Sequence, residues 1–214
     1  MDTFYSIPVD YLCSVYPKWN DIQNIIPSLC TYPSSIPSVL GLVREVERCL
    51  QVPASLHEVD DREQYYNNPS IINEEWTWIG TKFEKRLVMN PTCIFYRLNE
   101  LLNKVLGTEL TPRGIFYYPR GSCHVWHSNQ FHPHGWRMYI VVSRGESYFS
   151  YLEPISFNYH RVKESPFSIH LFKVGTAEET LYHSVVSFTD RWSFGWWIEE
   201  DAVKRLIHLV AQGH

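Results

Sequence analysis

The second half of the chain constrains the fold most, because it is a succession of short β-type runs. From residue 113 onward, segments rich in β-branched and aromatic residues alternate with Gly, Pro or polar turns. These segments are GIFYYP (114–119), RMYIVVS (137–143), SYFSYL (147–152), FSIHLFKV (167–174), ETLYHSVVSF (179–188) and RWSFGWWI (191–198). Several short strands in close succession predict a β-sandwich or a β-barrel.

The first 110 residues have a different texture, with many prolines and short helical patterns between them. The sequence predicts a helix over 35–51 and a stronger one over 90–107, which Pro91 can open and Gly107 can end. Residues 57–75 are polar and rich in Asn, which predicts a surface loop.

A third amphipathic pattern, over 199–213, predicts a closing helix. The predicted class is therefore α+β. An N-terminal helical or irregular segment (1–110) would pack on a β core with its closing helix (111–214).

Composition limits the classes of function. Hydrophobic residues make up 44% of the chain against 20% charged ones, which indicates a folded protein. A net charge of −4 without a Lys/Arg cluster argues against nucleic-acid binding. The five cysteines form no CxxC pair and suit a reducing compartment. The N-terminus lacks a secretory signal pattern, and no apolar run is long enough to cross a bilayer. These features predict a soluble, cytoplasmic protein.

Two histidines in the β region are candidate metal ligands. His127 follows one strand candidate and His183 lies within a later one. Residues two apart on an extended strand point the same way, so Asn129 would share the direction of His127. Two imidazoles and a third donor on one face leave three metal positions open for a chelating cosubstrate and O₂, as in non-haem Fe(II) oxygenases.

Arg191 and Ser193 would share one face of the last strand candidate. A guanidinium fork beside a hydroxyl can clamp a carboxylate. A metal site together with a carboxylate clamp is what the binding of 2-oxoglutarate requires.

With these residues the sequence resembles the Fe(II)/2-oxoglutarate-dependent oxygenase superfamily, and within it the prolyl-hydroxylase-like branch. YPRGSCHVWH (118–127) resembles the branch's Tyr-x-x-Gly followed six residues later by the first metal histidine. Three later segments resemble its next strand, its Gly-Glu-Thr-x-Phe turn and its closing segment with the distal histidine and the clamp arginine. They are WRMYIVV (136–142), GESYFSY (145–151) and YHSVVSFTDRWSFGWWI (182–198).

The resemblance covers about residues 111–200 and implies a double-stranded β-helix (a jelly-roll or cupin-like core). It implies a dioxygenase that hydroxylates a C–H bond with Fe(II) and the cosubstrate 2-oxoglutarate. The implied metal ligands are His127, Asn129 and His183. The implied cosubstrate contacts are Arg191 and Ser193, with Tyr118 and Tyr139 as further ones. The substrate class stays open between a small molecule and a peptide, with no membrane and no nucleic-acid partner expected.

The chain departs from this family at Asn129, where the family has Asp or Glu. A neutral amide binds Fe(II) more weakly than a carboxylate. Asn129 can ligate weakly or through water. Alternatively His132, His134 or His124 completes the set, or the metal site is impaired and the fold serves as a binding module.

Two arginines carry alternatives as well. Arg191 can form a buried ion pair with Asp190 or Glu199 in place of a clamp. Arg137 can pair with Glu146 or face the substrate. A cupin-like metal enzyme that does not use 2-oxoglutarate is a further rival, which the Arg191–Ser193 pattern disfavours.

Overall fold

The computed structural model describes residues 4–30, 50–51, 70–71, 76–81, 84–89, 93–128, 134–175 and 181–212. These residues form an α+β structure with an eight-stranded and a four-stranded sheet, in which the strand pairs are antiparallel. The helices of this part are α1 (Val9–Val15), α2 (Trp19–Leu29), α4 (Cys93–Leu106) and α5 (Glu200–Gln212). None of these helices is long and apolar enough to cross a membrane.

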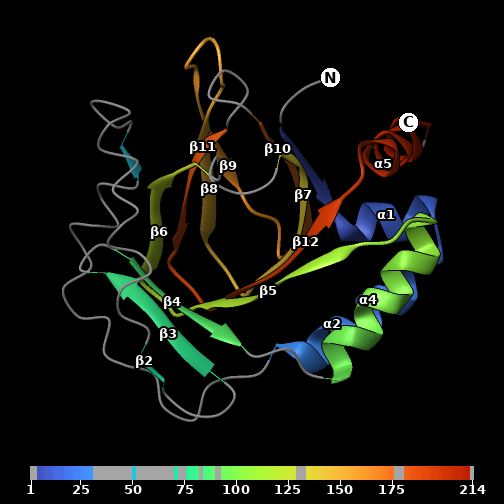
Figure 1. Ribbon diagram of the computed structural model, residues 1–214, viewed down its shortest axis with the longest axis horizontal. Coiled ribbons are helices and arrows are strands. Elements are labelled where there is room, and N and C mark those ends of the chain that lie inside the picture. Colours follow the sequence, from blue (N-terminus) through green and yellow to red (C-terminus); the bar gives the residue numbers. More distant parts are fainter. Residues whose placement is uncertain are drawn as a thin grey trace.

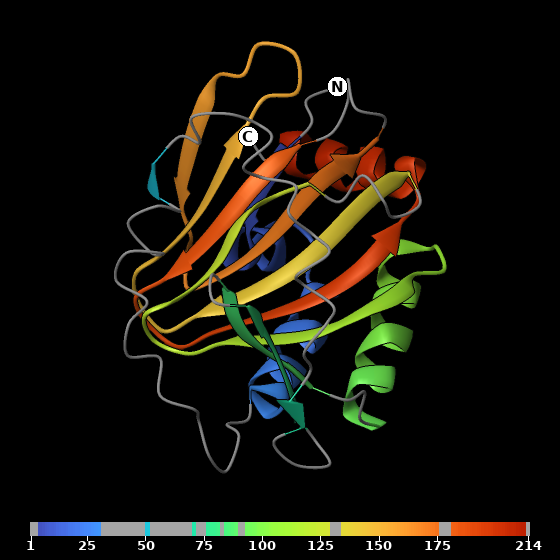
Figure 2. The same ribbon diagram turned by 60° about the vertical axis from the view of Figure 1, so that its left-hand side comes forward.

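The large sheet has the order β1-β10-β7-β12-β5-β4-β3-β2. Its strands in this order are β1 (Phe4–Pro8), β10 (Phe167–Val174), β7 (Gly135–Ser143), β12 (Arg191–Ile198), β5 (Thr111–Tyr118), β4 (Glu84–Met89), β3 (Trp76–Thr81) and β2 (Ser70–Ile71). The small sheet comprises β6 (Ser122–His127), β11 (Tyr182–Ser187), β8 (Ser147–Leu152) and β9 (Tyr159–Lys163), in that order. From β5 to β12 the chain passes repeatedly from one sheet to the other (Figures 1 and 2).

The two sheets face each other, and aromatic side chains fill part of the space between them. Phe149 on β8 lies 5.8 Å from Phe172 on β10, measured between ring centroids. The Phe172 ring in turn lies 4.8 Å from the ring of His183 on β11. Side chains from the inner faces of both sheets therefore meet in the space between the sheets.

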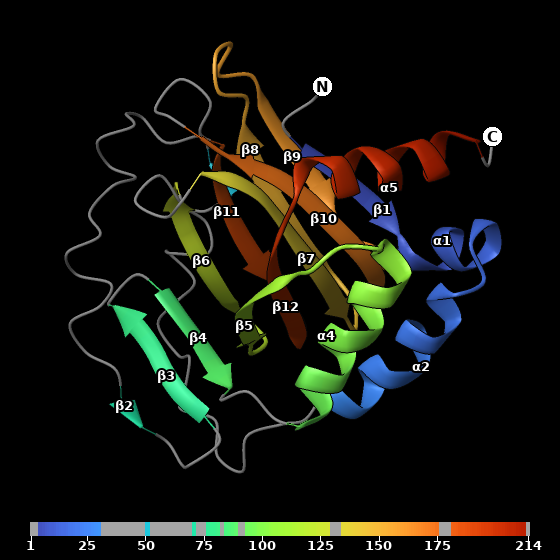
Figure 3. The same ribbon diagram turned by 45° about the vertical axis from the view of Figure 1, so that its right-hand side comes forward.

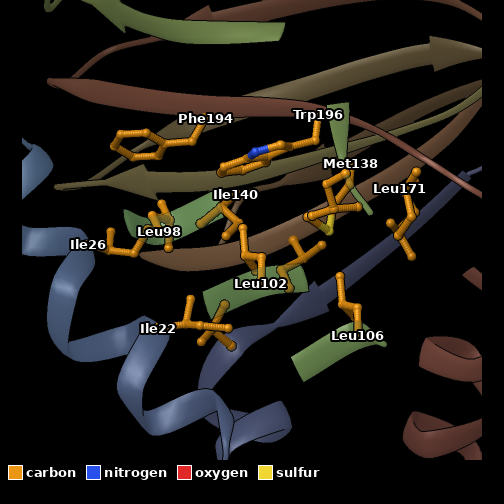
Figure 4. Close-up of a cluster of buried hydrophobic side chains, with 14 of the residues drawn as sticks. Ile22, Ile26, Leu98, Leu102, Leu106, Met138, Ile140, Leu171, Phe194 and Trp196 are labelled. Atoms are coloured by element: carbon orange, nitrogen blue, oxygen red, sulfur yellow. The ribbon is translucent and has the colours of Figure 1, made fainter. Parts of the chain in front are cut away.

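The opposite face of the large sheet packs against the helices (Figure 3). Along β12 the side chains alternate with period two, so Trp192, Phe194 and Trp196 enter the helix-side core while Arg191 and Ser193 face inward. Helix α4 presents Phe95, Leu98, Leu102 and Leu106 to this core, one stripe at helical spacing. Figure 4 shows the three leucines of this stripe. Each such buried side chain contributes roughly 1.5–3 kcal/mol, so this layer holds the large sheet rigidly behind the inner face.

Most predicted elements are confirmed. All six predicted β runs contain strands, and the helices predicted over 90–107 and 199–213 are α4 and α5. Gly107 ends α4 with a φ of 62°, a left-handed conformation that favours glycine. The predicted helix over 35–51 and the predicted loop over 57–75 lie largely outside the described residues. Within the second range the structure has the short strand β2.

The strands in the first 110 residues and strand β9 were not predicted from the sequence. Strand β1 is short and ends in Pro8, and it lies at the edge of the large sheet, where a proline is tolerated. Strands β3 and β4 extend the opposite side of the same sheet. The N-terminal part of the chain therefore contributes to the large sheet as well as to the helix layer.

Candidate active site

Two of the predicted metal ligands lie side by side at one end of the small sheet. His127 is the last residue of β6 and is directly opposite His183 in the register of β6 with β11. Their ring centroids are 4.1 Å apart, and both side chains are buried. Directly opposed residues of an antiparallel pair have close Cβ atoms, so the strand register itself holds the two imidazoles together.

A third imidazole, that of His124, lies next to this pair where the register of β6 with β11 is irregular. The pairing of β6 with β11 shifts between His183 and Val185, and Val185 is opposite His124. The ring of His124 stacks on His127 with 3.5 Å between centroids. We call His124, His127 and His183 the histidine end of the inner face.

The described residues do not complete a metal site at the histidine end. Within the described ranges, no group of three or more His, Cys, Asp or Glu side chains has the geometry to hold a metal ion. Asn129 and His132 lie outside those ranges, and His134 is exposed. The described part of the site is therefore a pair of buried imidazoles with a third one stacked beside it.

A backbone contact fixes the protonation of His183. Its Nδ1 lies 3.1 Å from the carbonyl oxygen of Leu181. A carbonyl only accepts hydrogen bonds, so Nδ1 carries the proton and a neutral ring has its lone pair on Nε2. Metal-binding histidines commonly donate their second N–H to a backbone carbonyl in this way.

The predicted clamp residue Arg191 is engaged by a carboxylate of the same chain. Glu164, which follows β9, accepts from Nε and Nη2 of Arg191 at 2.7 Å each. Both side chains are buried. Ser147 also donates to Glu164 at 2.6 Å, and the ring of Tyr118 lies 4.8 Å from the guanidinium carbon.

Arg191 forms a buried ion pair, but with a different acid from Asp190 or Glu199, the two partners that the sequence suggested. Asp190 instead accepts from the Tyr117 hydroxyl at 2.7 Å, and Glu199 accepts from Thr108 at 3.0 Å. Glu164 was missed because it is 27 positions away in sequence, and no local pattern connects a turn residue to the start of β12.

The charges of this buried pair stabilise each other. Burial acts to raise the pKa of Glu164, but the charge and hydrogen bonds of Arg191 outweigh it and hold the pKa below its usual value. Burial acts to lower the pKa of Arg191, and Glu164 raises it above its usual value. Burial also lowers the pKa of neighbouring His170 to about 4, with Nδ1 of that ring 3.6 Å from Glu164.

Arg191 and the histidine end lie at opposite ends of the inner face. On β11, His183 is near the first residue and Ser187 is the last, a separation of about 13 Å along a strand. The Arg191–Glu164 pair lies at the Ser187 end, since the backbone of Glu164 donates to Ser147 and Ser147 is opposite Ser187. Phe149 lies between the two ends, 5.2 Å from the ring of His183 and 5.1 Å from that of His170.

The other predicted cosubstrate contacts line the inner face of the large sheet. Ser193 is opposite Phe116 on β5 and Val141 on β7. The ring of Tyr139 stacks parallel to Phe172 at 5.6 Å. It also lies over Gly195, where a Cβ atom would come within 2.6 Å of the tyrosine ring. The absence of a side chain at Gly195 therefore leaves room for the ring of Tyr139.

A second buried arginine lies near the histidine end. Arg137 on β7 is opposite Phe172, the residue that contacts His183. Its side chain is 1% exposed and its guanidinium lies over the ring of Trp197. In the described part of the chain, Nη1 and Nη2 of Arg137 have no hydrogen-bond partner. Burial lowers the pKa of Arg137 to about 9.

Comparisons with known proteins give structural matches alone. No protein-family model matches the chain. No curated protein matches it either. Among solved structures, an oxidoreductase of the 2OG-Fe(II) oxygenase family from Burkholderia pseudomallei has a TM-score of 0.40 at 12% identity, covering 76% of this chain and 93% of its own.

Two further structures have similar scores. A prolyl-4-hydroxylase of Pseudomonas putida has a TM-score of 0.35 at 15% identity, covering 84% of this chain and 99% of its own. The dioxygenase for auxin oxidation 1 of Arabidopsis thaliana, solved with 2-oxoglutarate, has a TM-score of 0.40 at 9% identity, covering 92% and 83%.

Proposed function

We propose that this chain is an Fe(II)- and 2-oxoglutarate-dependent oxygenase with a double-stranded β-helix core. The buried pair of His127 and His183 carries the proposal, because two strands hold their rings 4.1 Å apart. The strand order supports the fold. Strands β5 to β12 divide into the neighbouring sets β10-β7-β12-β5 and β6-β11-β8-β9, and the chain alternates between them except at the consecutive strands β8 and β9.

The residues of the histidine end suit a divalent metal as far as they are described. His183 has the tautomer that presents Nε2, and His127 faces it across the strand pair. Asn129, two residues after His127, is the proposed third ligand. Its neutral oxygen leaves the site with less negative charge than a carboxylate would, which weakens the binding of a dication. A bound Fe(II) supplies the redox chemistry with which such enzymes hydroxylate C–H bonds.

The fit of 2-oxoglutarate differs from that of the metal. Glu164 already accepts from Nε and Nη2 of Arg191, and only Nη1 of this guanidinium lacks a hydrogen-bond partner among the described residues. A second carboxylate bound there by two hydrogen bonds would compete with Glu164 for Arg191, so the described arrangement does not fit 2-oxoglutarate at this arginine. The roles of Ser193, Tyr118 and Tyr139 as cosubstrate contacts stay predictions. The substrate is proposed to be a small molecule or a peptide.

The Arg191–Glu164 pair favours a second candidate function, a binding module on the same fold. In that protein the clamp arginine has become part of the scaffold, and Asn129 marks a metal site that has lost its carboxylate. The two candidates differ in whether metal and 2-oxoglutarate bind together.

Anaerobic titration with Fe(II) and 2-oxoglutarate separates the candidates. We expect the weak visible charge-transfer band of the Fe(II)–2-oxoacid chelate in the wild-type protein. His127→Ala and His183→Ala should each abolish the band and the binding of Mn²⁺, because each removes one of few metal ligands. His208→Ala, at an exposed histidine on α5, is the matched control and should leave both unchanged. Metal binding without the band would favour the binding module, and metal binding by both histidine variants would refute the ligand assignment.

A further inference from the structure

Arg137 is a buried cation whose hydrogen-bonding demand the described structure does not meet. The side chain is 1% exposed, and Nη1 and Nη2 have no hydrogen-bond partner among the described residues. Buried polar groups are nearly always hydrogen-bonded, and a buried charge normally needs a counter-charge. The face of Trp197 stabilises the cation but offers no acceptor for these N–H groups.

The described surroundings of Arg137 are positive and aromatic. A second cation, Arg113 on β5, lies 5.4 Å from the centroid of the same Trp197 ring. Glu146, the partner considered for Arg137 from sequence, lies beyond the far end of β7 and accepts instead from Tyr148. Among the described residues, Tyr139 and Phe172 also lie near Arg137 on the inner face.

The place of Arg137 connects it with the histidine end. Phe172 is directly opposite Arg137, and its ring lies 4.8 Å from that of His183. Arg137 and His183 are therefore both neighbours of Phe172 on the inner face. A small molecule anchored at Arg137 would extend past Phe172 toward the paired imidazoles.

We propose that Arg137 binds the carboxylate of a small-molecule ligand, with Trp197 behind its guanidinium and Phe172 and Tyr139 beside the ligand. The two Nη atoms of a guanidinium match the two oxygens of one carboxylate. This proposal gives the chemical class of the ligand, a carboxylate. Binding of the carboxylate does not depend on the proposed oxygenase function, but any reaction of the ligand does. The carboxylate can belong to the substrate or to 2-oxoglutarate, the ligand for which Arg191 offers no open clamp.

Calorimetric titration with two probes tests the proposal: phenylacetate, a monocarboxylate with an aromatic body, and 2-oxoglutarate. The variants are Arg137→Met and Arg137→Lys, with Arg205→Met on α5 as the control, since Arg205 caps the carbonyl of Leu106 far from the inner face. We expect Arg137→Met to weaken the binding of at least one probe tenfold or more. Arg137→Lys should give a smaller loss and Arg205→Met none.

The two probes identify the source of the carboxylate. If Arg137→Met loses the binding of phenylacetate alone, Arg137 binds the substrate. If the variant loses the binding of 2-oxoglutarate, Arg137 binds the cosubstrate. If no probe binds the wild-type protein, or both bind Arg137→Met as tightly, the carboxylate site is wrong and Arg137 is a structural partner of Trp197. A titration of the same samples with Mn²⁺ separates this outcome from failure of the proposed function. If Arg137→Met binds the carboxylate more weakly than the wild-type protein but no sample binds Mn²⁺, the carboxylate site is supported and the oxygenase function is refuted.

Discussion

Two buried arginines on the inner face of the large sheet have the same burial and opposite surroundings. Arg191, at one end, makes a two-bond pair with Glu164, which also accepts from Ser147. Arg137, at the other end, has an aromatic face and a second cation near it. Burial of a guanidinium thus does not by itself indicate a ligand site, because the identity of the partner decides the role.

The two arginines are expected to affect different properties, Arg191 the stability of the protein and Arg137 the binding of a ligand. At Arg191 the described residues supply both charges, so the charges balance without a ligand and the loss of either one should appear in folding. At Arg137 the described residues supply the cation without an acid hydrogen-bonded to Nη1 or Nη2, so its effect should appear in binding. Each variant below tests one side of this difference.

The largest expected effect is at Glu164. Glu164→Gln keeps the size of the side chain but leaves Arg191 as an uncompensated buried charge. We expect the free energy of unfolding in urea to fall by about 3–5 kcal/mol. Glu153→Gln is the matched control, because Glu153 is an acid with an exposed side chain bonded to His160, and exposed pairs contribute little to stability.

A double variant sharpens this test. Glu164→Leu with Arg191→Met removes both charges together, and it should recover most of the stability that either single change loses. Equal losses in the double and the single variants would mean that packing, and not the ion pair, determines the effect at this end.

The next effect is a dependence on pH at the same end. Burial lowers the pKa of His170 to about 4, against 6.5 for an ordinary histidine, and the ring is surrounded by Glu164, Arg191, Ser168 and Phe149. Because the folded pKa is below the unfolded one, the unfolded chain binds the proton first. Stability is then complete above pH 6.5 and declines as the pH falls toward 4, by about 3 kcal/mol in total.

Urea unfolding between pH 7 and 4.5 measures this decline. His170→Asn should flatten the pH dependence in that window, while His160→Asn, at a partly exposed histidine, should not. The pKa of Glu164 is lowered as well, so its contribution is lost at still lower pH, below about 4.5. A decline of unchanged slope in His170→Asn would assign the acid sensitivity to other groups.

The same two ends show what the sequence can predict. The β runs and α4 follow from period-two and helical patterns, which are local. The pairing of His127 with His183 follows from a family resemblance and is realised by the register of β6 with β11. Glu164 could not be paired with Arg191 from sequence, because the contact joins the residue after β9 to the first residue of β12, and only the folded sheets bring these two together.

For Arg137, the sequence predicts the direction of the side chain but not its hydrogen-bond partners. Its position two residues before Tyr139 in RMYIVVS places both side chains on the same face of a strand, yet no pattern predicts that Nη1 and Nη2 of Arg137 have no acceptor among the described residues. Charge balance in a core is a property of all neighbouring elements. Sequence reasoning can therefore name a buried arginine but not its partner.

The smallest expected effect on stability is at Arg137. Arg137→Met loses the cation–π contact with Trp197, worth about 2 kcal/mol when desolvated, but also removes the burial of an unpaired charge, so the two changes oppose each other. We expect the free energy of unfolding to change by less than about 1 kcal/mol, measured in urea beside Glu164→Gln. Addition of a carboxylate that binds should then stabilise the wild-type protein and not the variant, by linkage. A loss of about 3 kcal/mol or more in Arg137→Met would mean that this arginine, like Arg191, already has its counter-charge within the chain.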